Sequence, residues 1–290
     1  LNLEVGRNFI AGGQLLFDAR LIPWLQSFLT VQYEHWDISI YQNRKITDTF
    51  DYNFAFLSLG LQTLNSRHLL FKLAANRELA HIRPNISNNF TSSEFHDFLI
   101  FSAGMKLDTL NRADFPERGM LLETTAGLVT PWLSLFPGDL RTPVFRIHGD
   151  CRFFIPLAGR LTLFGTLTLG ATAGKMVPDD YLFYFGGSQF GRDILFPFPG
   201  LHFMEVASRN GAAGTAGLRF EPWHGLFFSL LAGYLRTADA LHGVFRASAA
   251  EYQGWGIEAG IRTPIGPVRV TLTGNEDWKL VLNLEAGYRF

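Results

Sequence analysis

The sequence predicts an all-β protein, a transmembrane antiparallel β-barrel that occupies residues 1–290 as one domain. The clearest evidence is the C-terminal end, where apolar residues alternate with polar or small ones from Leu280 to Phe290. Successive side chains of a strand point to opposite faces, so this period of two indicates a strand with one apolar face. The same alternation recurs at 161–169, 257–262 and 268–273, so most of the chain is expected to form strands.

Composition and segment length favour a membrane barrel over a soluble β-sandwich. Hydrophobic residues make up 47% of the chain and charged residues only 18%, which is low for a soluble domain. Many alternating segments exceed the ~5–6 residues of a soluble strand and reach the ~9–11 residues with which a tilted strand crosses a bilayer. Aromatic residues also gather near segment ends, as at Phe153–Phe154 and Trp223, where rings favour the membrane interface. A sandwich, with its apolar faces packed inside, is the alternative fold.

The connections divide the chain into fourteen expected strands. Short connections are expected at 22–24, 64–67, 116–119, 156–159, 222–225 and 264–267, and longer ones at 43–48, 76–93, 130–141, 176–210 and 236–250. Short turns that alternate with long loops are typical of outer-membrane barrels. Two further short connections, Ile10–Gly13 and Gly274–Asp277, fall on the long-loop side by parity. The expected strands are 1–9, 14–22, 25–42, 50–63, 66–78, 94–108, 118–129, 142–155, 160–173, 211–221, 226–236, 250–262, 267–274 and 278–290.

Charge and cysteine content exclude several classes of protein. The net charge of −1 provides no basic face for nucleic acid, so nucleic acid is not an expected partner. Cys151 is the only cysteine and can form no internal disulfide. Apolar stretches such as 225–235 are too short for a membrane-spanning helix, which needs ~18 residues or more. The first residues do not resemble a signal peptide, so the sequence is expected to begin after processing or inside a longer protein.

Three motifs, in matching order, resemble one family. The segment Leu107–Asp108–Thr109 followed by Phe115–Pro116–Glu117–Arg118–Gly119 resembles the "F-P-x-x-G" turn of the outer-membrane assembly barrel superfamily, the bacterial surface antigen or BamA-type proteins. Phe185–Gly186–Gly187 resembles the start of that superfamily's sixth external loop, which here covers 175–210. The terminal Tyr288–Arg289–Phe290 resembles the C-terminal sorting signal of outer-membrane barrels.

The resemblance implies a location in the bacterial outer membrane and a barrel of sixteen strands. In that superfamily the F-P-x-x-G turn joins strands eight and nine. Eight expected strands follow the turn here and six precede it, so the fourteen correspond to strands 3–16, with the first two strands and any upstream domains absent. Within the superfamily, the chain resembles most the barrels of Bacteroidetes patatin-like proteins. This finer likeness depends on Phe196–Pro197–Phe198–Pro199–Gly200, Phe203–Met204–Glu205 and Gly217–Leu218–Arg219–Phe220–Glu221.

The same resemblance gives the candidate site residues. Gly186, Gly187 and Arg192 are expected in a loop that inserts into the lumen, although the family's Arg-Gly-aromatic tip is reversed here, as Gly191–Arg192–Asp193. An arginine in a water-poor lumen needs carboxylate partners, and Glu221 and Glu258 are the candidates. The alternative is that Arg192 lies in solvent on a surface loop. Tyr288 and Phe290 are the candidate sorting signal.

Catalytic, metal and cofactor motifs are not found. Ser188 follows two glycines but lacks the second glycine of a nucleophile elbow and is interpreted as a loop serine. The histidines show no metal-ligand spacing, and Asp179–Asp180 are interpreted as solvated carboxylates rather than a calcium site. The glycines of Gly211–Gly217 are followed by no helical pattern, so they form no dinucleotide loop. No catalytic residue and no cofactor is therefore predicted for this segment.

Three functions agree with these observations. The first is a barrel that anchors or translocates an upstream patatin-like lipid-acyl hydrolase, as in type V secretion; the full-length protein would then be a phospholipase although this segment is not an enzyme. The second is a barrel that inserts other outer-membrane proteins, and the third is a self-contained diffusion channel. The expected partners are outer-membrane lipids, the protein's own upstream domain and, as a further possibility, the barrel-assembly machinery.

Overall fold

The computed structural model describes residues 9–17, 24–42, 45–63, 68–86, 94–132, 142–175, 177, 181–187, 194–264, 266–277 and 279–287. Among these residues, no helix is long and apolar enough to cross a membrane. The helix α1 (Leu241–Val244) has four residues and lies in the connection between two strands.

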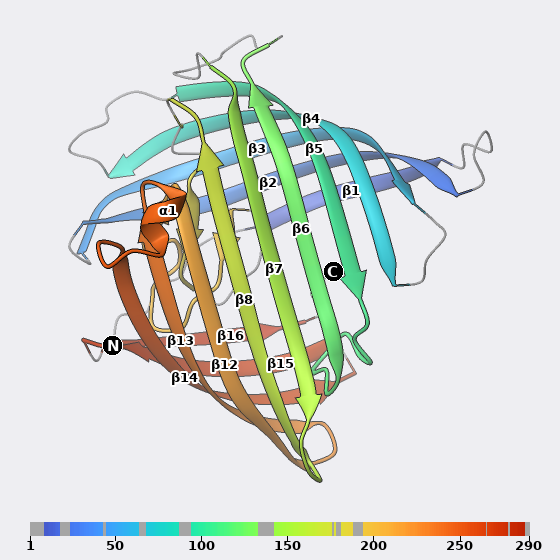
Figure 1. The fold of residues 1–290 in the computed structure, drawn as a ribbon, viewed down its shortest axis with the longest axis vertical. Helices are drawn as coiled ribbons and strands as arrows, with labels where there is room; N and C mark the ends of the chain where they lie inside the picture. The colour runs from blue at the N-terminus through green and yellow to red at the C-terminus, as the bar shows by residue number, and fades with distance from the viewer. Residues whose placement is uncertain are drawn as a thin grey trace.

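One curled antiparallel sheet of thirteen strands forms the wall of the molecule (Figure 1). Each strand pairs with its neighbours along the chain, except that β8 pairs with β12 across the connection between them. Among the described residues, β1 and β16 are the two ends of the sheet and do not pair with each other. The strands are β1 (Phe9–Phe17), β2 (Leu25–Gln42), β3 (Lys45–Thr63), β4 (Leu69–Ile86), β5 (Glu94–Asp108), β6 (Gly119–Thr130), β7 (Val144–Pro156), β8 (Leu161–Ala173), β12 (Asn210–Trp223), β13 (Leu226–Ala238), β14 (Ala250–Thr263), β15 (Gly266–Asn275) and β16 (Leu280–Ala286).

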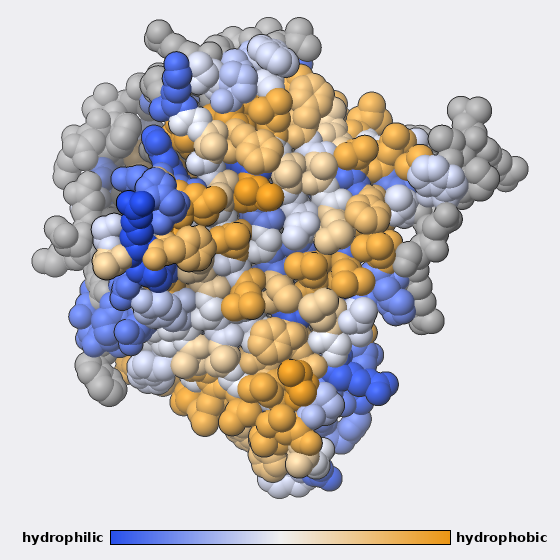
Figure 2. All heavy atoms as spheres, in the orientation of Figure 1, coloured by the Kyte–Doolittle hydropathy of each residue, from blue (hydrophilic) through white to orange (hydrophobic). Residues whose placement is uncertain are grey.

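The outward face of this wall is apolar. In β13, Phe228, Leu230 and Tyr234 are exposed, whereas the alternate residues Phe227 and Ser229 are buried. Figure 2 shows apolar side chains gathered over the outward face of β6, β7 and β8. Because a soluble sheet would turn this face toward its core, the alternation identifies a barrel whose outer surface meets lipid. The apolar belt, as we call this surface, includes Leu57, Leu59, Leu73, Phe101, Ile147, Leu167, Leu218, Leu230, Ile257, Leu282 and Leu284.

The inward face is polar and encloses a space that we call the lumen. Inward residues of β7 and β8 include Asp150 and Thr168, whose side chains are hydrogen-bonded at 3.0 Å. A second, small sheet lies between β8 and β12 in the chain and consists of β9 (Phe183–Phe185), β10 (Leu195–Phe196) and β11 (Val206–Ser208), in the order β10-β9-β11. Its aromatic side chains are buried, so this segment packs as part of the interior.

The arrangement around the F-P-x-x-G turn confirms the prediction for the second half of the chain. Eight strands of the main sheet follow the turn, β6 to β8 and β12 to β16. The short connections predicted near 156–159, 222–225 and 264–267 separate β7 from β8, β12 from β13 and β14 from β15. The connection predicted at Gly274–Asp277 separates β15 from β16.

The first half differs from the prediction in two respects. The predicted turn at Ile10–Gly13, and with it the division into strands 1–9 and 14–22, is wrong, because these residues lie inside β1 and pair with β2, Gly13 opposite Val31. The two adjacent glycines suggested a turn, but a glycine also fits a strand that is paired along its length. The loops predicted at 43–48 and 76–93 are too long, because β3 begins at Lys45 and β4 continues to Ile86.

Replacing Leu230 by arginine should destabilise the barrel. Leu230 is 63% exposed in the apolar belt, and a cation on the lipid face costs about 2–4 kcal/mol at the bilayer midplane. Denaturant unfolding in lipid vesicles should show this loss for Leu230→Arg and little change for the control Leu230→Met. Equal stability of the two variants would contradict a lipid-facing position.

Candidate functional site

The lumen is the candidate functional site, and two segments of the chain fold into it. The first, which we call the loop segment, runs from Tyr181 to Ser208 and is described at 181–187 and 194–208. The second, which we call the turn segment, is 109–118, between β5 and β6, and contains the F-P-x-x-G motif. They contact the wall at different places, and each contact depends on particular glycine, aromatic and arginine side chains.

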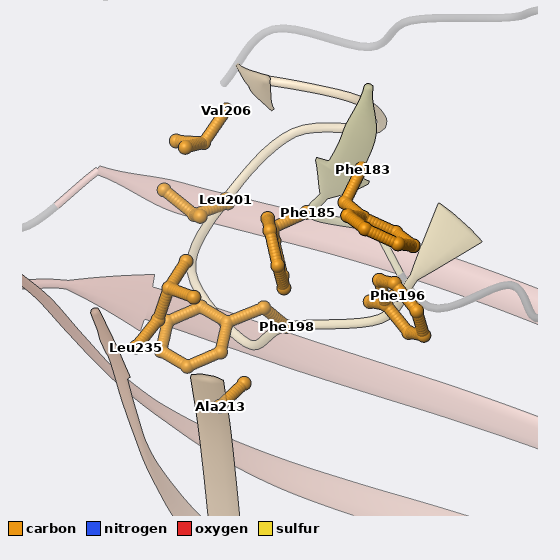
Figure 3. Close-up of a cluster of buried hydrophobic side chains, with 8 residues drawn as sticks. All are labelled: Phe183, Phe185, Phe196, Phe198, Leu201, Val206, Ala213 and Leu235. Carbon is orange, nitrogen blue, oxygen red and sulfur yellow. The ribbon is translucent and has the colours of Figure 1, made fainter. Parts of the chain in front are cut away.

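Aromatic rings of the loop segment pack against glycines of the wall. In the loop's core the rings of Phe183 and Phe185 both contact the Phe196 ring, and the Phe198 ring lies beside Leu235 and Ala213 of the wall (Figure 3). A Cβ on Gly211 would lie 2.4 Å from the Phe185 ring, a distance that no Cβ could adopt. Glycine at this position of β12 therefore lets a phenyl ring lie directly on the strand backbone.

The tip of the loop segment, as we call Phe196–Gly200, contacts β14 and β15 backbone to backbone. A Cβ on Gly254 would lie 1.9 Å from the Pro199 carbonyl oxygen, and one on Gly200 would lie 2.3 Å from the Gly274 carbonyl oxygen. Gly200 also has a φ of +82°, which favours glycine. The segment Phe196–Gly200, predicted to be family-specific, thus lies directly against the backbone of the wall.

Other residues of the loop segment contact the opposite part of the wall. Leu195 and Met204 join a buried cluster with Trp36 of β2 and Phe54 of β3. The Trp36 ring stacks on Phe203 with centroids 5.6 Å apart. The loop segment therefore bridges the lumen between β12–β15 and β2–β4, the two parts of the wall that are far apart along the sheet.

Gly186 and Gly187 lie at the bend of the loop segment. Their φ angles are +128° and +74°, and a Cβ on Gly186 would lie 2.0 Å from the His202 carbonyl oxygen. The Gly186 amide donates to the Phe196 carbonyl and the Gly187 amide to the Leu201 carbonyl, both at 3.0 Å. These bonds join the two halves of the loop.

The turn segment places Phe115 inside the lumen. Phe115 is fully buried, and its ring stacks on Phe227 of β13 with centroids 4.1 Å apart. A Cβ on Gly260 of β14 would lie 2.6 Å from the Phe115 ring, so a glycine again makes room for an aromatic side chain. Phe115 has a φ of +46°, an unfavourable backbone conformation for a bulky residue that the surrounding contacts must maintain.

Arg219 of β12 connects the turn segment to the wall. It is 9% exposed, and its guanidinium lies 5.3 Å from the Phe115 ring centroid and donates to the Pro116 carbonyl at 3.3 Å. It also donates to the Ser229 hydroxyl at 3.4 Å, and that hydroxyl donates to Glu258 at 3.1 Å. Arginine keeps its charge when buried, so the rings, the carbonyl and the Glu258 carboxylate supply the compensation that water would otherwise provide.

Two further arginines contact the turn segment. Arg269 of β15 lies 4.6 Å above the Phe115 ring, and Arg262 of β14 donates to the Asp114 carbonyl at 3.2 Å. Phe115 is thus held between the Phe227 ring and the guanidinium groups of two strands. We call the group Phe115, Arg219, Phe227 and Arg269 the arginine–aromatic clamp.

A cavity of about 1090 Å³ lies between the two segments. Charged residues of both signs line it, and some are paired: Lys106 with Glu123 at 2.9 Å, and Arg152 with Asp150 at 2.7 Å. The walls are therefore polar but nearly balanced in charge, with Phe196 of the loop segment and Pro116 of the turn segment among the lining residues.

The remaining predicted site residues have different positions. Glu258 faces the lumen in contact with Ser229, whereas Glu221 lies at the β12–β13 turn and accepts a hydrogen bond from the Gly225 amide at 2.8 Å. Arg192, Tyr288 and Phe290 lie outside the described residues, as do Ser188 and Asp179–Asp180, so their assigned roles stay predictions. Sequence reasoning missed Arg219, although it stands two residues before Glu221 and shares its inward parity.

Comparisons with known proteins identify the family. The OMP85 superfamily profile matches residues 29–290, so the chain belongs to this superfamily and is an outer-membrane β-barrel protein. No curated protein matches the sequence. Among solved structures, BamA from Haemophilus ducreyi lacking POTRA domains 1–3 is similar with a TM-score of 0.68 and 14% identity, covering 97% of this chain and 60% of that one.

Two CdiB structures are also similar in fold. The protein from Escherichia coli has a TM-score of 0.58 and 13% identity, over 98% of this chain and 51% of that one. The protein from Acinetobacter baumannii has a TM-score of 0.62 and 10% identity, over 96% of this chain and 49% of that one. The chain thus spans between about half and three-fifths of the length of these three structures.

The Gly254→Ala variant should displace the tip of the loop segment. The added methyl group would collide with the Pro199 carbonyl at 1.9 Å, and overpacking of this kind typically costs about 1–3 kcal/mol. Limited proteolysis of the loop segment in folded protein should become faster. The control is Gly149→Ala, whose Cβ would make ordinary contacts with the Thr124 side chain at 3.5 Å and the Glu123 carbonyl oxygen at 3.9 Å. Equal cleavage of both variants would contradict the docked position.

The Phe115→Ala variant should release the turn segment. Loss of a buried phenylalanine costs about 3–5 kcal/mol. If this loss weakens only the docking of the turn segment, the population of molecules with the turn segment displaced rises by about a hundredfold or more. Trypsin cleavage after Arg112 or Arg118 should accelerate accordingly. Phe228→Ala, which removes an exposed neighbouring ring from the outward face, should leave cleavage unchanged; similar acceleration in both variants would argue against the clamp.

Proposed function

We propose that this chain is the membrane-embedded barrel of a longer protein and that it anchors, and passes across the outer membrane, an upstream lipid-acyl hydrolase domain of the patatin type. The loop segment would lie at the external end, as the family resemblance implies. No residue of the barrel takes part in hydrolysis in this proposal. Its lipid contacts are those of the apolar belt.

The occupied lumen is the observation that carries this proposal. The loop segment contacts both β2–β4 and β12–β15, and the turn segment is fixed to β12–β15 by the clamp. An occupied lumen suits a barrel that holds or conducts a polypeptide by moving internal segments, and it disfavours a permanently open diffusion channel. The patatin assignment itself is supported by the motif at Phe196–Gly200, which forms the loop tip.

A second candidate function is the insertion of other proteins into the outer membrane. The observation that favours it is the match to the OMP85 superfamily, together with the likeness of the F-P-x-x-G turn to that of the assembly barrels. In that case the upstream part of the protein would contain no hydrolase.

The intact mass and activity of the native protein separate these functions. Mass spectrometry of the polypeptide from outer membranes should give a mass tens of kilodaltons above 32.6 kDa, and the purified protein should release fatty acids from phospholipid vesicles. A larger mass without hydrolysis would favour the insertion function. A mass near 32.6 kDa would contradict both the anchoring function and the insertion function, and would favour a diffusion channel.

A further inference from the structure

A polar patch interrupts the outward face of β2 and β3. Val31 and Tyr33 of β2 are exposed and belong to the apolar belt, but the next outward residues along the strand are His35 and Asp37. β2 and β3 have 18 and 19 residues, whereas a tilted strand crosses a bilayer in about 9–11. These strands are therefore long enough to extend beyond the hydrocarbon, and His35 and Asp37 lie in the half of β2 that is nearer its connection to β3.

Three side chains of the patch have the spacing of metal ligands. His35 and Asp37 are two residues apart on one face of β2, and Asp51 of β3 is the direct cross-strand partner of Asp37. One potential ligand atom from each residue lies within 4.8 Å of the other two. The distance from His35 Nε2 to Asp37 Oδ1 is 3.3 Å. Two ligand atoms of a tetrahedral zinc site with bonds of ~2.0–2.1 Å lie about 3.4 Å apart, which is close to this distance.

Asn53 orients the His35 ring for ligation. Its Oδ1 lies 3.0 Å from His35 Nδ1 and also accepts from the Tyr33 hydroxyl at 2.7 Å. With the Asn53 carbonyl oxygen as acceptor, His35 Nδ1 carries the proton, and Nε2 is then the ring nitrogen that would bind a cation. A hydrogen bond of this kind fixes the tautomer in many metal-bound histidines.

The charges around the cluster also favour a cation. His35 Nε2 lies 3.3 Å from the Asp37 carboxylate, and Asp37 stands directly opposite Asp51 on the neighbouring strand, so two like-charged carboxylates are cross-strand partners. A cation bound by both carboxylates would relieve this repulsion. Asp51 also accepts a hydrogen bond from the Asn85 side chain, and Arg83 of β4 is its cross-strand neighbour on the other side.

We propose that His35, Asp37 and Asp51 bind a divalent transition cation of the Zn²⁺ class on the outward face of the barrel. One imidazole nitrogen with two carboxylate oxygens suits Zn²⁺, whereas Ca²⁺ prefers six to eight oxygen ligands. Three protein ligands leave one tetrahedral position for water or another small ligand. The side chains of His35 and Asp37 are 22% and 35% exposed, which leaves the cation a route from solvent.

The experiment is a titration of the full-length protein in detergent micelles with Zn²⁺, followed by competition with a chromophoric chelator. The wild-type protein should bind one Zn²⁺ at this cluster, and His35→Ala, Asp37→Asn and Asp51→Asn should each lose that binding. Asn53→Ala keeps all three ligands and should weaken binding by about 10–100-fold, as loss of a ligand's orienting partner does elsewhere.

The control is His81→Ala, which removes a histidine of β4 that is not one of the three ligands. Its ring stacks on Phe95 with centroids 4.0 Å apart. Heat-modifiable migration on gels checks that each variant is folded. Absence of Zn²⁺ binding in the folded wild-type protein would overturn the proposal, as would undiminished binding in Asp37→Asn and Asp51→Asn or a preference for Ca²⁺. If His35→Ala fails to fold, the Asn53→Ala titration decides in its place.

Discussion

The structure depends on one constraint, that backbone amides and carbonyls in hydrocarbon must bond to each other because no water is available. Antiparallel pairing of successive strands meets this constraint. The side chains then differ according to the face of the sheet on which they lie, toward lipid or toward the lumen. The strict alternation of β13, with Leu230 outside and Ser229 inside, follows from this difference. The constraint is satisfied along the whole sheet except at its ends, where the described parts of β1 and β16 have no common partner.

The lumenal segments supply cohesion of a second kind. The loop segment contacts Trp36 and Phe54 on one side of the lumen and Gly254 on the other, so it joins parts of the wall that the hydrogen-bond ladder connects only through many intervening strands. The arginine–aromatic clamp does the same for the β5–β6 connection and β12–β15. Neither contact adds a strand to the main sheet, so both can be broken without dismantling that sheet.

Much of the fold could be predicted from the sequence because period-two alternation is a local signal, and the eight strands after the F-P-x-x-G turn lie close to their expected positions. The errors occurred where a local signal has two meanings, as with Gly12 and Gly13, which suit a turn as well as a paired strand. The clamp could not be predicted in this way. Phe115 and Arg219 are 104 positions apart, and only the curling of the sheet brings them together. Parity alone could have marked Arg219 as a lumenal cation.

The strands of the wall differ in length. β2, β3 and β4 have 18, 19 and 18 residues, whereas β12 has 14 and β13 has 13. The shorter strands β12–β15 have glycines on which the loop segment and the turn segment lie, so their inward face packs against these two segments. In the long strands β2 and β3, the inward residues Trp36 and Phe54 pack against the loop segment, whereas the outward residues His35 and Asp51 are polar. One strand pair therefore binds the loop segment on its inward face and presents polar side chains on its outward face.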